Sequence, residues 1–468
     1  MPDWIDRPLF EIAQALRKGT LTARNLTEEG IARHDKWDVK LGAYKTWDAE
    51  YARRQADASD AAFKANKDLG LAQGILFSVK DIYGAEGFPI YAGSPKRLPP
   101  EWEKNGPVLN KVRQQLAVIP GKTHTVEFAF GGLGSNPHWD VPRNPWDAQS
   151  HRAPGGSSSG AGVSLWEGSA SIAFGTDTGG SVRVPASMTG NVGLKTTKGR
   201  WSTDLITILS TSFDTPGILA KSVSDISFGF NAIDPVTKAS VSSAIETRDV
   251  SGIKLGITKD YFWDRCADDV GETVENAIAE LKNAGARTST IKIPEAGTSV
   301  QVWGEGAIVA SEGYSFLQTR LPDWIDSLDP NVLSRMEVAK EAKTLDYFSA
   351  LFKISKLSQS VHAKLETVDA LAVPTVPITP PKIEDLVDAE AYKKNNLLAL
   401  SNTMPGNVLG ACAITIPAGL DKSGMPVGLQ LIALPNREEE LISLALGIER
   451  ILGTPRDRLG TPPLGGRL

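Results

Sequence analysis

The segment of residues 150–187 constrains the fold most, because it crowds glycine and serine around short apolar runs. A flexible Gly/Ser linker would not return to apolar runs such as VSLWEG and SIAFG, which belong in a core. We therefore interpret GGSSSG as a tight loop that opens a helix over about residues 158–167, and SASIAFG as a buried strand. TDTGGS is then a second loop, and SVRVPASM begins a second helix.

This interpretation places Ser181 at a helix N-terminus, beside Gly179 and Gly180. Free backbone N–H groups at a helix N-terminus favour negative charge, and glycines let a carbonyl group approach the backbone closely. Such a loop suits an oxyanion hole beside a hydroxyl nucleophile, and it equally suits a phosphate-binding site. The segment alone leaves these two alternatives open.

Helical patterns and short apolar runs alternate along the rest of the chain. Amphipathic helical patterns lie in LFEIAQALRKG, in AEYARRQADASDAAFKANK and at residues 274–285. Runs that predict buried strands lie at residues 74–81, 116–123 and 370–378. This alternation predicts an α/β fold.

No convincing domain boundary divides the chain. We therefore predict one domain over residues 1–468, in which residues 456–468 form an extended C-terminal tail. Residues 232–252 are polar and are expected to form an excursion on the surface.

Charge and composition argue against several classes of partner. The net charge is −5, with acidic and basic residues interspersed, so neither nucleic acid nor an anionic membrane is expected to bind. There is no run of about 18 apolar residues that could span a membrane, and MPDWIDRPLF does not resemble a signal peptide. Cys266 and Cys412 form no redox motif and fit a reducing compartment. These features predict a cytoplasmic protein.

Several short motifs fail on inspection. PGKT lacks the earlier glycine of a phosphate-binding loop, because Leu116 occupies that position. The pattern G-x-S-x-G does not occur around Ser181. The histidines have no metal-ligand spacing, so no metal is expected. His138 and His151 flank the small-residue segment and are candidates for a catalytic base, although packing is the commoner role of such histidines.

Three segments together resemble the amidase signature family, serine hydrolases that cleave carboxamides with a Ser–Ser–Lys triad and no histidine. They are GILFSVKD around Lys80, GGSSSG around Ser157 and GTDTGGSVRVPA around Ser181. Further blocks follow in family order, so the resemblance covers about residues 8–455: GKTHTVEFAFGG, RNPWD, GNVGLKTTKGR, FDTPGILAKSVSD, DALAVPTVP and GMPVGLQLIA. The resemblance implies a single-domain α/β fold with a mixed central β-sheet flanked by α-helices on both faces.

The resemblance also implies catalytic roles. Ser181 is the expected nucleophile and forms an acyl-enzyme, while Ser157 relays protons between Ser181 and the base Lys80. A neutral base at pH 7 requires burial to lower the lysine pKa from about 10.4 to near 7. The family places a cis peptide before the bridging serine, here Gly156–Ser157. The expected oxyanion hole consists of the backbone amides of Thr178, Gly179, Gly180 and Ser181.

Other residues near these motifs carry weaker expectations. Phe130, Gly131 and Gly132 lie where family members often line the pocket, and Ser158 is a further candidate for substrate binding, with capping of the helix as its alternative role. Lys80 beside Asp81 has the alternative of an exposed ion pair. Asp177 and Arg183 are expected to pair and brace the loop, and Cys412, which replaces a common proline, is expected to be a core thiol.

The resulting hypothesis is an amidase without metal or cofactor, which converts a small-molecule amide to an acid and ammonia or an amine. One alternative is the glutaminase subunit of a tRNA-dependent amidotransferase, and another is a non-catalytic binding relative. A homodimer is expected from the family alone.

Overall fold

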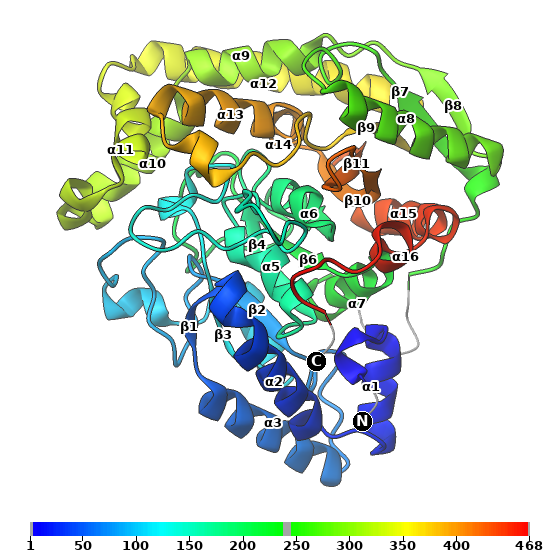
Figure 1. The fold of residues 1–468 in the computed structure, drawn as a ribbon. Helices are drawn as coiled ribbons and strands as arrows, with labels where there is room; N and C mark the ends of the chain where they lie inside the picture. The colour runs from blue at the N-terminus through cyan, green and yellow to red at the C-terminus, as the bar shows by residue number, and fades with distance from the viewer. Residues whose placement is uncertain (1–2, 237–244, 467–468) are drawn as a thin grey trace.

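A mixed β-sheet of 11 strands forms the centre of the computed structural model, which describes residues 3–236 and 245–466 (Figure 1). The strand order is β1-β3-β2-β4-β6-β5-β10-β11-β9-β7-β8. β2 runs parallel to β3 and β4, β7 runs parallel to β8 and β9, and the other pairs are antiparallel. The strands are β1 (Tyr44–Trp47), β2 (Phe77–Lys80), β3 (Gly121–Thr123), β4 (Ile172–Asp177), β5 (Val192–Lys195), β6 (Thr215–Ala220), β7 (Lys254–Ile257), β8 (Arg287–Thr290), β9 (Ala370–Pro374), β10 (Cys412–Leu420) and β11 (Pro426–Ala433).

Helices surround this sheet. The α-helices are α1 (Leu9–Lys18), α2 (Ala23–Leu41), α3 (Ala49–Lys64), α4 (Pro107–Arg113), α5 (Ser159–Glu167), α6 (Arg183–Thr189), α7 (Val223–Ile233), α8 (Asp268–Asn283), α9 (Glu295–Glu305), α10 (Ile308–Arg320), α11 (Pro330–Met336), α12 (Thr344–Leu365), α13 (Ala389–Ser401), α14 (Met404–Val408), α15 (Glu438–Leu452) and α16 (Pro455–Leu459). Short 3-10 helices are η1 (Trp4–Asp6), η2 (Pro100–Glu103), η3 (Glu127–Ala129), η4 (Val250–Gly252), η5 (Pro322–Ser327), η6 (Glu337–Lys340) and η7 (Ile383–Leu386).

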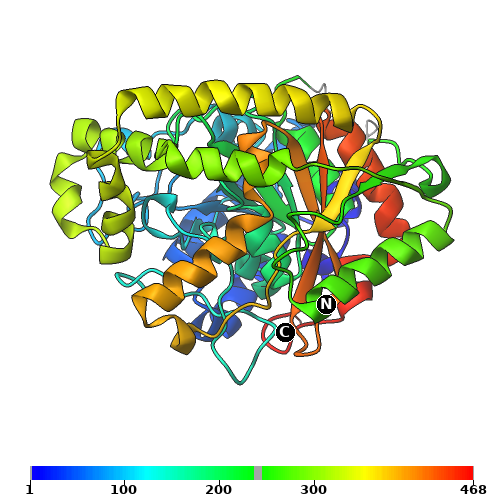
Figure 2. The same cartoon turned by 90° about the horizontal axis from the view of Figure 1, so that it is seen from above.

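The central strands are buried on both faces, as β4 illustrates. Successive side chains of a strand point to opposite faces, so Ala173 faces away from Ile172 and Phe174. Ala173 packs in a cluster with residues of α5 and α6, whereas Ile172 and Phe174 belong to the large core cluster that includes Phe228 of α7. Helices therefore cover both faces of the sheet, as the α/β prediction requires. Figure 2 shows α12 as the long yellow helix along the upper edge of the molecule.

The small residues of α5 are explained by close packing. A Cβ at Gly160 would overlap the carbonyl oxygen of Ala43 and approach the backbone of His124. Gly160 N–H donates to the His124 carbonyl at 3.1 Å, so the first turn of α5 lies directly on backbone. The segment is a packed layer rather than a linker, and its predicted helix and strand correspond to α5 and β4.

The C-terminal segment differs from its prediction. Pro455–Leu459 form α16, which Thr454 and Asp457 begin with a capping box, so this part is not extended. Beyond it, Leu464 N–H donates to the Pro145 carbonyl at 3.1 Å, which docks the tail on the body of the protein. Residues 467–468 lie outside the described residues.

Two further expectations concern the surface and the membrane. In the polar segment 232–252, η4 occupies Val250–Gly252, while residues 237–244 lie outside the described residues. None of the described helices combines the length and the apolar composition that crossing a bilayer requires. All described strands join one sheet, and a single domain remains our interpretation of the chain.

Candidate active site

Lys80 is the last residue of β2 and is fully buried at the centre of the sheet. Its strand lies between β3 and β4, so the side chain reaches the loops that follow these strands. The Nζ group donates to Ser157 Oγ at 2.7 Å and to Thr176 Oγ1 at 2.9 Å. The structure thus brings together two residues that lie far apart in the sequence and that the motifs had singled out.

Burial controls the protonation of Lys80. It lowers the pKa of this side chain from 10.5 to about 7, against the opposing charges of Asp214 and Asp177. The alternative of an exposed ion pair with Asp81 is wrong, because Asp81 is also fully buried and its carboxylate lies 3.1 Å from Lys122 Nζ instead. Lys80 is therefore a partly neutral amine in contact with hydroxyl groups.

Ser157 lies in the loop before α5. The peptide bond between Gly156 and Ser157 is cis, as the family resemblance implies. Gly156 N–H donates to the Gly132 carbonyl at 2.8 Å, and a Cβ on Gly156 would lie 2.6 Å from Gly134 N. The Ser157 carbonyl in turn accepts from Val126 N–H at 3.1 Å. Backbone contacts on both sides thus hold the Ser157 hydroxyl towards Lys80.

Ser181 lies in the loop between β4 and α6. Because α6 begins at Arg183, Ser181 precedes the helix rather than starting it. Ser158 N–H approaches the Ser181 carbonyl at 3.4 Å, which places the two serine loops side by side. Among the described residues, no hydrogen bond joins the hydroxyls of Ser157 and Ser181. Catalytic hydrogen bonds are often long without substrate and shorten when the substrate binds.

A buried ion pair braces this loop, as expected. Arg183 Nε and Nη2 donate to the Asp177 carboxylate at 3.0 and 2.9 Å, and Val182 N–H donates to the same carboxylate at 3.1 Å. Although burial alone would raise it, Arg183 holds the pKa of Asp177 at about 2. Neither side chain is exposed, so their role is to shape the loop.

A second contact fixes the glycines of the loop. Gly180 has a φ of +139°, and a Cβ there would overlap Thr403 Oγ1. That hydroxyl donates to the Gly179 carbonyl at 2.7 Å. On the other side, Thr178 Oγ1 donates to Asp214 Oδ1 at 2.5 Å. Groups from distant parts of the chain thus hold both ends of the predicted oxyanion hole.

Ser181 opens into a cavity of about 410 Å³. The predicted residues Thr178, Gly179, Phe130 and Gly131 also line it. Its other walls come mainly from α9–α11, α13 and α14: Ala129, Leu209, Trp303, Gly304, Ala307, Ile308, Val309, Ala310, Arg335, Val338, Lys393, Asn396, Leu397, Leu400 and Met404. A cavity of this volume suits a small molecule.

Two candidates for substrate binding are not among the lining residues. Ser158 precedes α5 but its side chain does not cap the helix; its Oγ lies 3.4 Å from both the N and the O of Thr176 and so joins the helix to β4. Gly132 donates its N–H to Asn396 Oδ1 at 2.7 Å, and a Cβ there would lie 2.7 Å from Leu400 Cγ. Both residues support the cavity from behind.

A family model named Amidase matches residues 25–442. The chain belongs to the amidase family. The 2-amino-5-chloromuconic acid deaminase of Comamonas testosteroni is 43% identical over 456 residues, which cover 97% of this chain and 98% of that relative. A glutamyl-tRNA(Gln) amidotransferase subunit of Geobacter metallireducens is 30% identical and covers 95% of this chain and 97% of its own. A crystal structure of an amidase superposes with a TM-score of 0.85 at 27% identity, covering 96% of this chain and 100% of the other. This amidase is accordingly a hydrolase with the α/β fold of its family.

The histidine candidates lie elsewhere in this amidase. His138 Nε2 lies 3.3 Å from the buried Glu127 carboxylate, and burial raises the pKa of Glu127 to about 8. Neither His138 nor His151 is among the residues that line the cavity of Ser181. Packing and ion pairing therefore describe these histidines better than catalysis.

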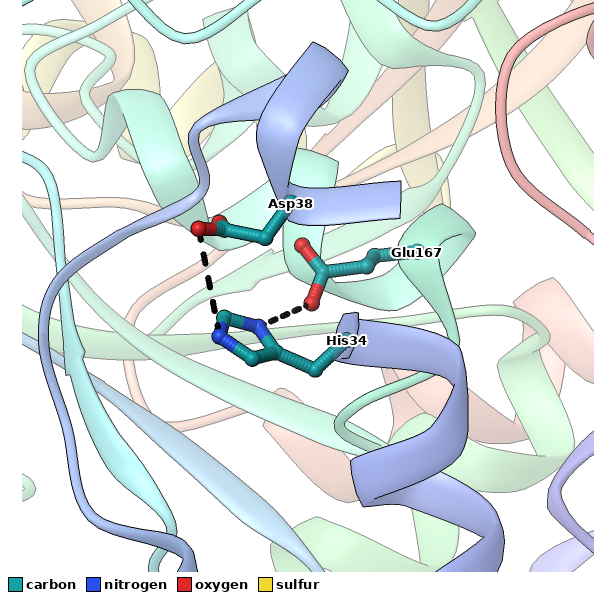
Figure 3. Close-up of side chains that lie close together, drawn as sticks. All are labelled: His34, Asp38 and Glu167. Atoms are coloured by element: carbon teal, nitrogen blue, oxygen red, sulfur yellow. Dashed lines mark hydrogen bonds and ion pairs between the residues drawn. The ribbon is translucent and has the colours of Figure 1, made fainter. Parts of the chain in front are cut away.

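One cluster has the residue types of a metal site, which the sequence spacing did not suggest. Figure 3 shows His34 between Asp38 and Glu167. Both ring nitrogens already face a carboxylate: Nδ1 lies 2.7 Å from Glu167 and Nε2 lies 3.8 Å from Asp38. The imidazole also stacks on Trp47 with ring centroids 3.7 Å apart. We interpret the cluster as a buried connection between α2 and the end of α5.

Proposed function

We propose that this amidase hydrolyses a carboxamide C–N bond through an acyl-enzyme on Ser181, with Ser157 as proton relay and Lys80 as base. The hydrogen bond of 2.7 Å between Lys80 Nζ and Ser157 Oγ carries the proposal. A lysine with a pKa of about 7 is neutral in about half of the molecules at pH 7, and can therefore accept a proton. Removal of an amino group, for which the Comamonas testosteroni relative is named, is in keeping with cleavage of a C–N bond.

The first step forms the acyl-enzyme. Ser181 Oγ attacks the amide carbon while its proton passes to Ser157, whose own proton passes to Lys80 Nζ. The negative charge that develops on the carbonyl oxygen is stabilised by the backbone N–H groups of residues 178–181. The proton then returns from Lys80 through Ser157 to the leaving nitrogen, and the C–N bond breaks. Ammonia or an amine departs, and the acyl group remains on Ser181.

The second step releases the acid. Water attacks the acyl carbon, and its proton passes along the same relay to Lys80. Collapse of this intermediate breaks the bond to Ser181 Oγ, which regains a proton through Ser157. The products are a carboxylic acid and regenerated enzyme, so the reaction consumes one water and needs no metal or cofactor.

The direct test uses a fluorophosphonate probe, which phosphonylates an activated serine. We expect stoichiometric labelling of Ser181 in the intact protein and none in Ser181→Ala. Amide hydrolysis should be lost in the same variant, since no nucleophile remains. Labelling of another serine, or amide hydrolysis by Ser181→Ala, would contradict the proposal.

The alternative is a glutaminase subunit that works with partner chains, because the Geobacter metallireducens relative, with 30% identity, is part of an amidotransferase. Hydrolysis of amides by the isolated chain, without ATP or tRNA, separates the two functions. An inactive isolated chain that still reacts with the fluorophosphonate would favour the glutaminase alternative. The non-catalytic alternative predicts no labelling at all.

We also propose that two copies of the chain form a homodimer through α12. Leu345, Phe348 and Phe352 form a stripe on this helix, with exposed fractions of 76%, 53% and 72%. Asp346 and Lys353 flank the stripe two helical turns apart, and therefore lie on the same side of the helix. In an antiparallel pair related by a twofold axis, each Asp346 meets the other copy's Lys353, so the surface is complementary to itself.

A further inference from the structure

The cavity that contains Ser181 combines apolar walls with unbalanced positive charge. Arg335 of α11 and Lys393 of α13 both line it. Among the described residues that line the cavity, none is acidic. A site of this kind suits a ligand with a hydrocarbon body and a negative charge, because an uncharged ligand would leave a desolvated cation without a partner. The apolar walls include Leu209, Trp303, Ile308, Leu400 and Met404.

Arg335 is held in a defined orientation. Its Nε donates to the Asn331 carbonyl at 2.8 Å, and its Nη2 donates to the Phe130 carbonyl. The guanidinium carbon lies 4.5 Å from the centre of the Phe130 ring and 5.8 Å from that of Tyr392. Within the described chain, Arg335 forms no ion pair with a carboxylate. A fixed guanidinium that lacks an acidic partner is well suited to binding the carboxylate of a ligand.

We propose that Arg335 binds a carboxylate of the substrate, and that the substrates are small monoamides of dicarboxylic acids. The amide carbonyl lies at Ser181, the carbon chain contacts the apolar walls, and the carboxylate pairs with Arg335. Lys393, which is exposed at the cavity, attracts the anion from solution. This substrate class rests on the proposed amide hydrolysis at Ser181.

The test measures kcat/KM of the full chain on matched amides. Succinamic acid is compared with butyramide, glutaramic acid with pentanamide, and adipamic acid with hexanamide. Within each pair the amide and the chain length are the same, and only the terminal carboxylate differs. We expect the acid to be preferred by about 10-fold or more in at least one pair, the size of effect that charge-assisted hydrogen bonds produce. Equal or higher kcat/KM for the neutral amide in every pair would overturn the proposal.

Variants then assign the preference to Arg335. Arg335→Gln should lower the ratio of kcat/KM for acid over neutral amide by about 10-fold or more, chiefly through a higher KM for the acid. Arg335→Lys keeps the charge but not the planar fork, so its ratio should be intermediate. Lys394→Gln is the matched control, because it removes one positive charge from α13 at a residue that does not line the cavity. An unchanged ratio in Arg335→Gln would overturn the role of this residue.

Failure of this substrate class can be told from failure of the proposed function. Ser181→Ala should bind adipamic acid more tightly than hexanamide in calorimetry, since binding does not need the nucleophile. If Ser181 reacts with the fluorophosphonate and neutral amides are hydrolysed without preference for the acids, only the substrate class is wrong. If Ser181 does not react and no amide is hydrolysed, the proposed function itself is wrong.

Discussion

At the residue scale, the pKa of Lys80 predicts how activity depends on pH. A base must be unprotonated, and burial lowers the pKa of Lys80 to about 7. Below that pH the lysine is protonated, so kcat/KM should fall about tenfold for each further pH unit, while above about pH 8 it should level off. The buried Glu127 titrates nearby, with a pKa of about 8. Glu127→Gln therefore serves as the control, and its profile should keep the same inflection. A flat profile from pH 5 to 9, with chemistry limiting, would argue against a lysine base.

The same residue should distinguish amides from esters. An amide nitrogen must be protonated as its bond breaks, whereas an alkoxide leaves with less assistance. If the proton comes from Lys80 through Ser157, Lys80→Ala should lower kcat/KM for an amide about 10-fold more than for an ester with the same acyl group. Ser181→Ala should abolish both reactions. Equal losses for the two substrates in Lys80→Ala would mean that Lys80 does not protonate the leaving group.

At the element scale, the loop between β4 and α6 depends on its contact with the start of α14. Gly180 combines a φ of +139° with the absence of space beside Thr403 Oγ1. Gly180→Ala should therefore displace the backbone amides of residues 178–181 and lower kcat/KM by about 10²-fold, while the far-UV spectrum stays unchanged. Gly199 also has a positive φ, of +82°, but nothing lies within 4 Å of a Cβ there. Gly199→Ala separates backbone strain from the steric overlap, and should keep its activity. Comparable losses in both variants would show that strain alone explains the effect.

Elements also mark how far the sequence could predict this protein. α5 and β4 could be predicted because their small and apolar residues are local patterns that reflect packing on neighbouring backbone. α16 was missed although Thr454 and Asp457 supply a capping signal, because its prolines and glycines suggested an extended arm. The wall of the cavity could not be predicted, since Arg335 reaches the cavity of Ser181 only through the tertiary packing of α11. Sequence motifs thus locate the groups that share a loop or strand, and leave the substrate-facing groups on distant helices unassigned.

At the scale of the whole molecule, the exposed stripe on α12 predicts a dimer with paired charges. Among the described residues, Asp346 and Lys353 form no ion pair within their own chain. In the antiparallel pair, Asp346→Lys places two like charges together, so the dimer dissociation constant should rise about 10-fold or more in sedimentation. Lys353→Asp should weaken the dimer equally, and the double variant should restore it, because the opposite charges meet again with their positions exchanged. Lys356→Asp alters the charge of the same helix without an Asp346 partner and should not be rescued by Asp346→Lys. A chain that stays monomeric at every concentration, or a double variant weaker than either single one, would show that α12 does not pair in this way.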